Sequence, residues 1–271
     1  MSRLQLHTGH DPLEGVGVDG AITTGAQRCR IPDEFSPVLE AAVERLGRVH
    51  GAQSLYVYGS VATGTARVGK SDADLVAIGL DAATAKRLGE DLSAAFSGLC
   101  RGVEVGPADL SDYEGSTDQA YGNRVFLRHY CVHLAGPDVA SALPNFPADL
   151  AAARGFNGDI GLRASQWRKE LRGSDPALLA RRIARKTLFA VAGLVSIHDA
   201  VWTTDRIAAA HRWSVVRPRL AAALDTLVAW GDGWPAESSQ MEIRSALEGV
   251  VADVVADFRD QIGLWASTES R

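Results

Sequence analysis

Two stretches of this chain indicate its fold: YGSVATGTA, residues 58–66, and SDADL, residues 71–75. The first is rich in glycine and small hydroxyl residues and predicts a tight turn. The second carries Asp72 and Asp74 at the start of an expected strand. Alternate side chains of a strand point to the same face, so these two carboxylates would lie together. The two stretches predict a pair of carboxylates beside a turn of small residues.

Strands are expected on both sides of this turn. Residues 54–58, SLYVY, include β-branched and aromatic residues and end at a glycine, and residues 72–78 alternate polar or small residues with apolar ones. A bare Asp-x-Asp also fits a surface hairpin with two solvated aspartates. The full pattern is Gly-Ser, eleven residues and Asp-x-Asp between two strands, and it is much more specific. It indicates a nucleotide site.

The chemistry of such a site explains these residue types. Mg²⁺ is usually held by one or two carboxylates together with substrate phosphates. Asp72 and Asp74 would supply the carboxylates. Glycine lets the backbone approach a triphosphate closely, and hydroxyl side chains add donors. The candidate nucleotide-binding residues in this part of the chain are Gly59, Ser60, Thr63 and Ser71.

In these residues the chain resembles the nucleotidyltransferase superfamily, whose signature is Gly-Ser followed by Asp-x-Asp. Within it, the chain looks most like the aminoglycoside adenylyltransferases and related bacterial two-domain proteins. The match is specific over residues 54–78 and general elsewhere. The resemblance implies an α/β catalytic domain followed by a helical bundle, with Mg²⁺ and ATP. It also implies transfer of AMP to a hydroxyl of a small, aminoglycoside-like molecule, with release of pyrophosphate.

A third carboxylate is expected, because two-metal transfer usually needs more than two ligands. Glu104 is a single acid between two valines in an expected strand over residues 102–105. The resemblance implies that an acid on this strand binds metal or acts as the general base, and both roles stay open. A solvent-facing side chain is the alternative interpretation. Asp109 is the second candidate acid.

Composition narrows the class of protein. The chain has 271 residues, 46% hydrophobic and 23% charged, as in an ordinary globular protein. Three scattered cysteines, the lack of an apolar run of about 18 residues and the lack of an apolar N-terminal core predict a cytoplasmic protein without a membrane span. Residues 1–150 hold 12 Lys and Arg against 19 Asp and Glu, and residues 151–271 hold 16 against 14. An acidic first half suits a metal and a cationic acceptor and disfavours nucleic acid, although it is also an ordinary solubility charge.

The order of elements predicts an α/β N-terminal domain, with a small mixed sheet and helices on one face, followed by an all-α bundle. We expect a flexible arm over residues 1–31, a catalytic domain over 32–147 and a helical acceptor-binding domain over 148–271, with the boundary near Pro144 to Pro147. Residues 112–122 are expected to form an exposed loop. Expected helices cover 32–50, 81–99, 148–172, 176–198, 203–212, 216–230 and 239–266. Residues 123–130 are expected to form a short helix or turn, and a last strand covers 131–136.

Two basic rows follow from the spacing in the helical half. Arg181 and Arg185 are one helical turn apart, as are Arg182 and Lys186. The resemblance implies that a basic residue of the helical domain reaches the triphosphate, which makes Arg185 and Lys186 candidates. A solvated helix face fits equally well. The candidate acceptor-binding residues, among which no pattern selects, are Asp175, Asp199, Trp202 and Asp205.

Other functions share the same motif. Small antitoxin nucleotidyltransferases adenylylate a partner protein, so a protein acceptor is the alternative, although such antitoxins are usually much shorter. Their helical toxins display Arg-x4–6-His, a spacing that Arg206 and His211 meet here. Arg124 and His129 have the same spacing inside the catalytic half, which shows how easily it arises by chance. A tRNA or poly(A) polymerase would need a basic groove with aromatic stacking, which the sequence does not indicate.

Overall fold

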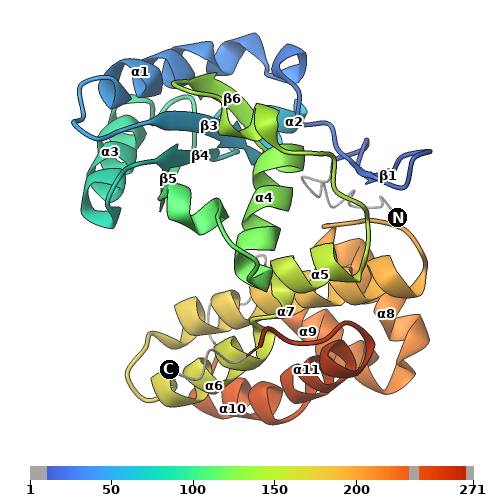
Figure 1. Cartoon of the computed structure of the whole chain (residues 1–271). Helices are drawn as coiled ribbons and strands as arrows, with labels where there is room; N and C mark the ends of the chain where they lie inside the picture. The colour runs from blue at the N-terminus through green and yellow to red at the C-terminus, as the bar shows by residue number, and fades with distance from the viewer. Residues whose placement is uncertain (1–10, 232–237, 267–271) are drawn as a thin grey trace, which may run out of the picture. The chain divides into compact units, whose positions relative to one another are not determined.

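The computed structural model describes residues 11–231 and 238–266. Contacts between residues divide the chain into two compact units, Met1–Phe146 and Pro147–Arg271. The first combines a sheet with helices, and the second is helical (Figure 1). The predicted class, an α/β unit with a small mixed sheet followed by an all-α unit, is therefore confirmed.

The first unit is built on a mixed four-stranded sheet. Its strands are β3 (Ser54–Tyr58), β4 (Ala73–Ile78), β5 (Val103–Ala108) and β6 (Val132–Ala135), in the order β5-β4-β3-β6. β3 is antiparallel to both β4 and β6, whereas β4 is parallel to β5. The parallel pair is made possible by the crossover helix α3 (Ala82–Ala95), which Asp81 caps by accepting the Thr84 N–H at 2.8 Å.

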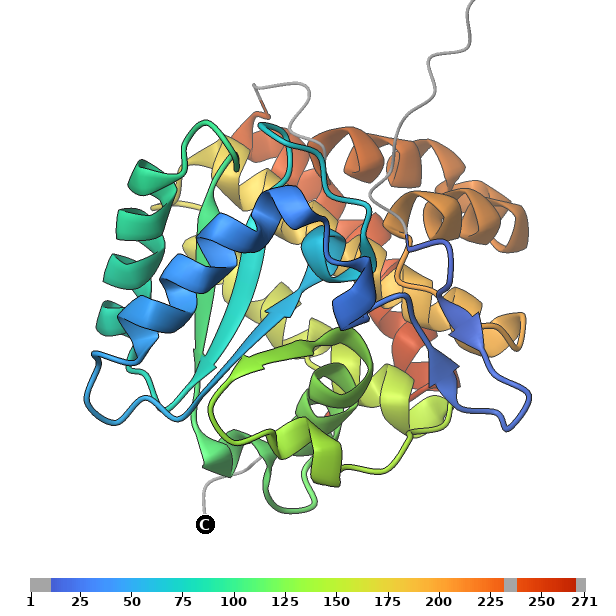
Figure 2. The same cartoon turned by 90° about the horizontal axis from the view of Figure 1, so that it is seen from above.

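Helices cover both faces of this sheet, not one face as predicted. α1 (Ser36–Leu46) and α3 pack against the face that carries Leu55 and Leu75, and α4 (Asp118–Tyr130) packs against the opposite face (Figures 1 and 2). The reason is in the strands themselves, because β3 and β4 are apolar on both sides. Tyr56 and its neighbours on that second face would be exposed without α4.

Two expectations for the first unit are wrong in detail. The expected loop over residues 112–122 is too long, because Thr117 accepts the Ala120 N–H at 3.1 Å and starts α4 early. The expected flexible arm falls partly on residues 1–10, which lie outside the described residues. Residues 11–31 form the hairpin of β1 (Gly15–Val16) and β2 (Ile22–Thr23), and the Ile22 N–H donates to the Phe146 carbonyl at 3.0 Å. This stretch therefore belongs to the first unit.

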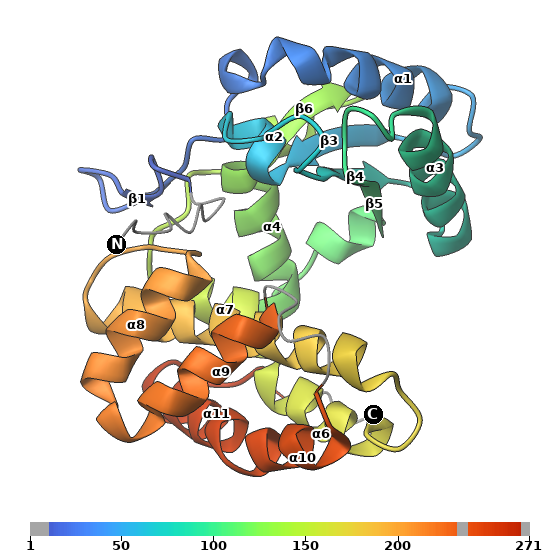
Figure 3. The ribbon, with the colours of Figure 1, turned by 180° about the vertical axis from the view of Figure 1, so that it is seen from behind.

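The second unit is organised around α7 (Pro176–His198) (Figure 3). This helix contacts every other α-helix that the structure describes in the unit. Asp175 caps α7, accepting the Leu178 N–H at 2.9 Å, and its bounds agree with the prediction. Residues 190–196 are buried without interruption, so this part of α7 is surrounded on all sides. The surrounding helices are α5 (Leu150–Asn157), α6 (Ile160–Glu170), α8 (Arg206–Val216), α9 (Ala221–Gly231), α10 (Gln240–Glu248) and α11 (Val250–Gln261).

Two long helices expected in this unit are each divided in two. The helix expected over 148–172 breaks at Gly158, where a Cβ atom would come within 2.3 Å of the Trp265 ring. The backbone N–H of Trp265 donates to the Gly158 carbonyl at 3.0 Å, so this carbonyl has a partner where the helix ends. The helix expected over 239–266 breaks at Gly249, between α10 and α11. Of the helices in the described ranges, none has both the length and the apolar character to cross a membrane.

Candidate active site

The register of β3 and β4 brings the two halves of the motif together. Tyr58, the last residue of β3, pairs with Asp74 of β4. The next residue, Gly59, has φ +69°, and a Cβ atom there would lie 2.7 Å from Asp74 Oδ2. The Asp74 carboxylate therefore rests against the bare Cα of Gly59, a place that no side chain can share.

The turn after β3 is one short helix, α2 (Gly59–Thr63). The Ser60 carbonyl accepts the Thr65 N–H at 2.9 Å and the Ala66 N–H at 3.0 Å, which closes the turn. Thr63 is buried and its hydroxyl lies 3.1 Å from the Thr65 hydroxyl, so it stabilises the turn from inside. Ser71 accepts the Arg67 N–H at 2.9 Å and closes the following loop. Of the four candidate nucleotide-binding residues, Thr63 and Ser71 thus have structural roles.

Asp72 is engaged by an arginine that the sequence reasoning missed. Arg101 donates from Nε to Asp72 Oδ1 at 3.0 Å and from a terminal nitrogen to Oδ2. The pair is formed because β5 runs parallel to β4, so the residues just before the two strands are neighbours; the Ala73 N–H donates to the Gly102 carbonyl at 2.9 Å. Arg101 lies three residues before Glu104, and this closeness to a candidate site residue was the signal in the sequence that could have identified it.

Glu104 lies beside Asp74 in the parallel ladder. Its neighbours Val103 and Val105 are buried on the α3 face, so the exposed Glu104 belongs to the opposite face, as Asp74 does. Burial raises the pKa of Tyr58, and the charges of Asp74 and Glu104 raise it further. Tyr58, Asp74 and Glu104 thus form a row across three neighbouring strands. Asp109, the second candidate acid, instead forms a capping box with Asp112 in the turn η3 (Leu110–Tyr113).

The donors fit Mg²⁺ in kind, since carboxylate oxygens are the ligands it prefers. Asp74 and Glu104 lie in paired register on one face of the sheet. Asp72 would join them only by exchanging its partner Arg101 for the metal. Among the residues that the structure describes, no three His, Cys, Asp or Glu side chains stand close enough together to hold a metal ion.

Lys186, expected to reach a triphosphate, is held inside the helical unit. Its Nζ lies 2.7 Å from Asp159 Oδ1 and donates to the Phe156 carbonyl at 3.0 Å. Burial lowers the pKa of Lys186, and the Asp159 charge opposes this effect. Arg185 is exposed and donates from Nε to the Gly231 carbonyl at 3.3 Å. These contacts tie Lys186 to α5 and to Asp159 within the helical unit.

The candidate acceptor-binding acids have local partners. Asp175 caps α7, and Asp205 caps α8 by accepting the N–H groups of Ile207 and Ala208 at 3.0 and 3.1 Å. Asp199 binds Arg212 through both oxygens, at 2.6 and 2.8 Å. Trp202 is buried. Asp175 and Asp205 thus act as helix caps, and Asp199 forms an ion pair.

Comparisons with known proteins yield little. No family model matches the chain, and no curated protein matches it. Among solved structures, the chain is similar to one from the crystal structure of a toxin-antitoxin with AMP-PNP, at 21% sequence identity and a TM-score of 0.26. The match covers 47% of this chain and 91% of that chain.

Proposed function

We propose that this protein is a Mg²⁺-dependent nucleotidyltransferase that transfers AMP from ATP to a hydroxyl group and releases pyrophosphate. One observation carries the proposal: the sheet register seats the Asp74 carboxylate on the Cα of Gly59 and beside Glu104. A Gly-Ser turn and carboxylates on one strand face are what a triphosphate with its metal requires.

The residues of the chain have separate roles in the proposed reaction. Gly59 and Ser60 face the β- and γ-phosphates with backbone and hydroxyl donors, and Asp72, Asp74 and Glu104 are the carboxylates that would hold Mg²⁺. When bound, the metal would neutralise phosphate charge during displacement. Glu104, which is exposed, is also placed to take the proton of the acceptor hydroxyl. The acceptor oxygen then forms a bond to the α-phosphorus as the bond to pyrophosphate breaks.

Arg101 has a role that follows from its contact with Asp72. In the proposed reaction Asp72 exchanges the Arg101 guanidinium for the metal, and the released guanidinium remains beside the triphosphate position. A guanidinium binds phosphate oxygens well, so Arg101 would help to neutralise the charge of the leaving pyrophosphate. This residue takes the place that Lys186 was expected to fill, because Lys186 is paired with Asp159.

The proposed acceptor is a small polyhydroxylated molecule with positive charge, such as an aminoglycoside. The support is the acidic balance of residues 1–150, with 19 acids against 12 bases, which attracts cations. Adenylylation of a partner protein is the other acceptor class, and the same assay separates the two. An AMP adduct on an aminoglycoside supports a small-molecule acceptor, whereas an adduct found solely on a co-purified protein contradicts it.

The first prediction concerns the carboxylates. Asp72→Asn and Asp74→Asn should each lower Mg²⁺-dependent transfer by at least about 100-fold, because each removes a charge from the phosphate site. Transfer is measured as pyrophosphate release and as the mass of the adduct, with each of the four nucleoside triphosphates. Asp91→Asn is the matched control, since Asp91 is an exposed acid on α3. Near-normal turnover in a folded Asp74→Asn protein would contradict the assignment.

A further inference from the structure

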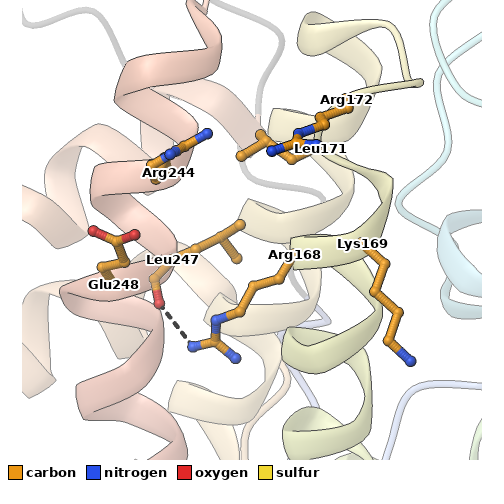
Figure 4. A pocket seen from close by; sticks show the side chains of 7 residues that line it. All are labelled: Arg168, Lys169, Leu171, Arg172, Arg244, Leu247 and Glu248. Atoms are coloured by element: carbon orange, nitrogen blue, oxygen red, sulfur yellow. Dashed lines mark hydrogen bonds between the residues drawn. The ribbon is translucent and has the colours of Figure 1, made fainter.

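A groove of about 390 Å³ lies within the helical unit, between α6 and α10 (Figure 4). Four cations line it, with a single carboxylate, that of Glu248. The cations are Arg168, Lys169, Arg172 and Arg244. Two buried side chains, Leu171 and Leu247, also line the groove. The groove is thus a small concave surface with strong positive charge, distinct from the carboxylate row of the first unit.

The four cations have no carboxylate partner among the described residues, and the same holds for Arg181, Arg185 and Arg259 of this unit. Across residues 11–231 and 238–266, none of the four forms an ion pair with an Asp or Glu; Arg168 donates to the Leu247 carbonyl at 3.2 Å. Six other cations of the unit each pair with a carboxylate: Arg163, Arg182, Lys186, Arg212, Arg217 and Arg219. Ion pairs among the described residues therefore leave the positive charge of the groove uncompensated.

The helix dipole of α6 accounts for the presence of two of the four cations. Arg168 and Lys169 lie in the last turn of α6, where cations stabilise the helix C-terminus. The same reason does not apply to Arg244, which precedes the last turn of α10. Arg172 and Arg244 extend toward each other from the two sides of the groove (Figure 4). Two facing guanidinium groups repel each other. An anion bound between them is attracted to both, and these attractions offset the repulsion.

We propose that the groove binds a compact phosphorylated small molecule, with its phosphate held between Arg172 and Arg244. The planar fork of a guanidinium matches phosphate oxygens and binds them in pairs. The volume of about 390 Å³ lies at the small end of ligand pockets, which are roughly 300–1,000 Å³. Leu171 and Leu247 supply an apolar floor, and Glu248 opposes a long polyanion that would run through the groove. This site is separate from the proposed transfer reaction.

The test is a calorimetric titration of the whole protein with inorganic pyrophosphate in EDTA, so that no metal contributes. Arg172→Gln and Arg244→Gln should each weaken binding by at least about 10-fold, because each removes one fork from the phosphate. Arg259→Gln is the matched control, since Arg259 is exposed on α11 and does not line the groove. It should change the affinity by less than about 2-fold. Because pyrophosphate is also a product of the proposed reaction, the titration is repeated in Arg101→Gln, and binding should persist there.

Three outcomes would overturn this proposal. One is the absence of binding to the unaltered protein, and another is an equal loss in Arg259→Gln, which would mean a general effect of net charge. The third is a single-stranded RNA that binds more tightly than pyrophosphate and depends on Arg172 and Arg244. That result would make the groove a nucleic-acid contact. Circular dichroism of each variant shows that the comparison is made on folded protein.

Discussion

At the scale of the residue, Gly59 shows why the motif needs this amino acid. Its φ of +69° is one that side chains other than glycine rarely adopt. The space beside its Cα is taken by the Asp74 carboxylate, 2.7 Å from where a Cβ atom would lie. The sequence indicated the constraint on φ, because a glycine directly after an expected strand predicts a turn. The constraint on space depends on the register of β3 with β4, which only the folded sheet contains.

The pair Gly59→Ala and Gly69→Ala separates these two constraints. Both positions have positive φ, +69° and +71°, but a Cβ atom at Gly69 would meet nothing within 4 Å. Each substitution should cost about 1 kcal/mol of unfolding free energy through the backbone alone. Gly59→Ala should cost more and should also lower transfer, because the methyl group displaces the Asp74 carboxylate. Urea unfolding and the adduct assay measure the two effects. Equal stability and equal turnover in the two variants would show that the close approach has no consequence.

At the scale of the element, Lys186 joins three helices of the second unit. It lies on α7, its carboxylate partner Asp159 lies between α5 and α6, and it also donates to the Phe156 carbonyl of α5. Asp159 is buried and is shared with Arg163, whose Nε lies 2.9 Å away. The sequence placed Lys186 one turn from Arg182 on a helix, and this local periodicity is correct. Lys186 is partly buried because it pairs with the buried Asp159, whereas Arg182 pairs with Glu170 and stays exposed.

Lys186→Met should therefore reduce stability. Removing one partner of a buried pair leaves a carboxylate poorly compensated, and we expect a loss of about 2–3 kcal/mol because Arg163 remains. Arg182→Met is the control on the same helix, since its pair with Glu170 is exposed and should contribute less than about 1 kcal/mol. Urea denaturation gives both values. If Lys186→Met kept full stability but bound ATP more weakly, the original expectation of a phosphate contact would be restored.

At the scale of the whole molecule, stability should depend on pH through His129. Its Nε2 accepts the Phe146 N–H at 2.8 Å, so the folded state requires the neutral ring. Burial, with a smaller contribution from the Arg128 charge, lowers the pKa of His129 to about 4. In the unfolded chain the same group takes up a proton near pH 6.5. The unfolded state thus binds more protons between these two values, and protonation favours unfolding there.

The free energy of unfolding should be flat with respect to this group above about pH 6.5 and should fall toward about pH 4, by about 1–2 kcal/mol because solvent partly screens the half-buried ring. Denaturation curves at a series of pH values measure it. His129→Gln should remove most of this slope, whereas His211→Gln, at an exposed position of α8, should keep it. A slope that survives in His129→Gln would assign the effect to other groups.

The sequence alone determined the strands that carry the motif, the turn between them and the bounds of α7. These features depend on local patterns: alternation, a glycine after a short strand rich in aromatic and aliphatic residues, and an Asp-Pro cap. The tertiary structure decided which charges are available. Arg101 engages Asp72, Asp159 engages Lys186, and the Trp265 ring packs against Gly158 between α5 and α6. Each of these contacts joins residues on different elements, so their pairing follows from strand register and helix packing, which periodicity within one element does not specify.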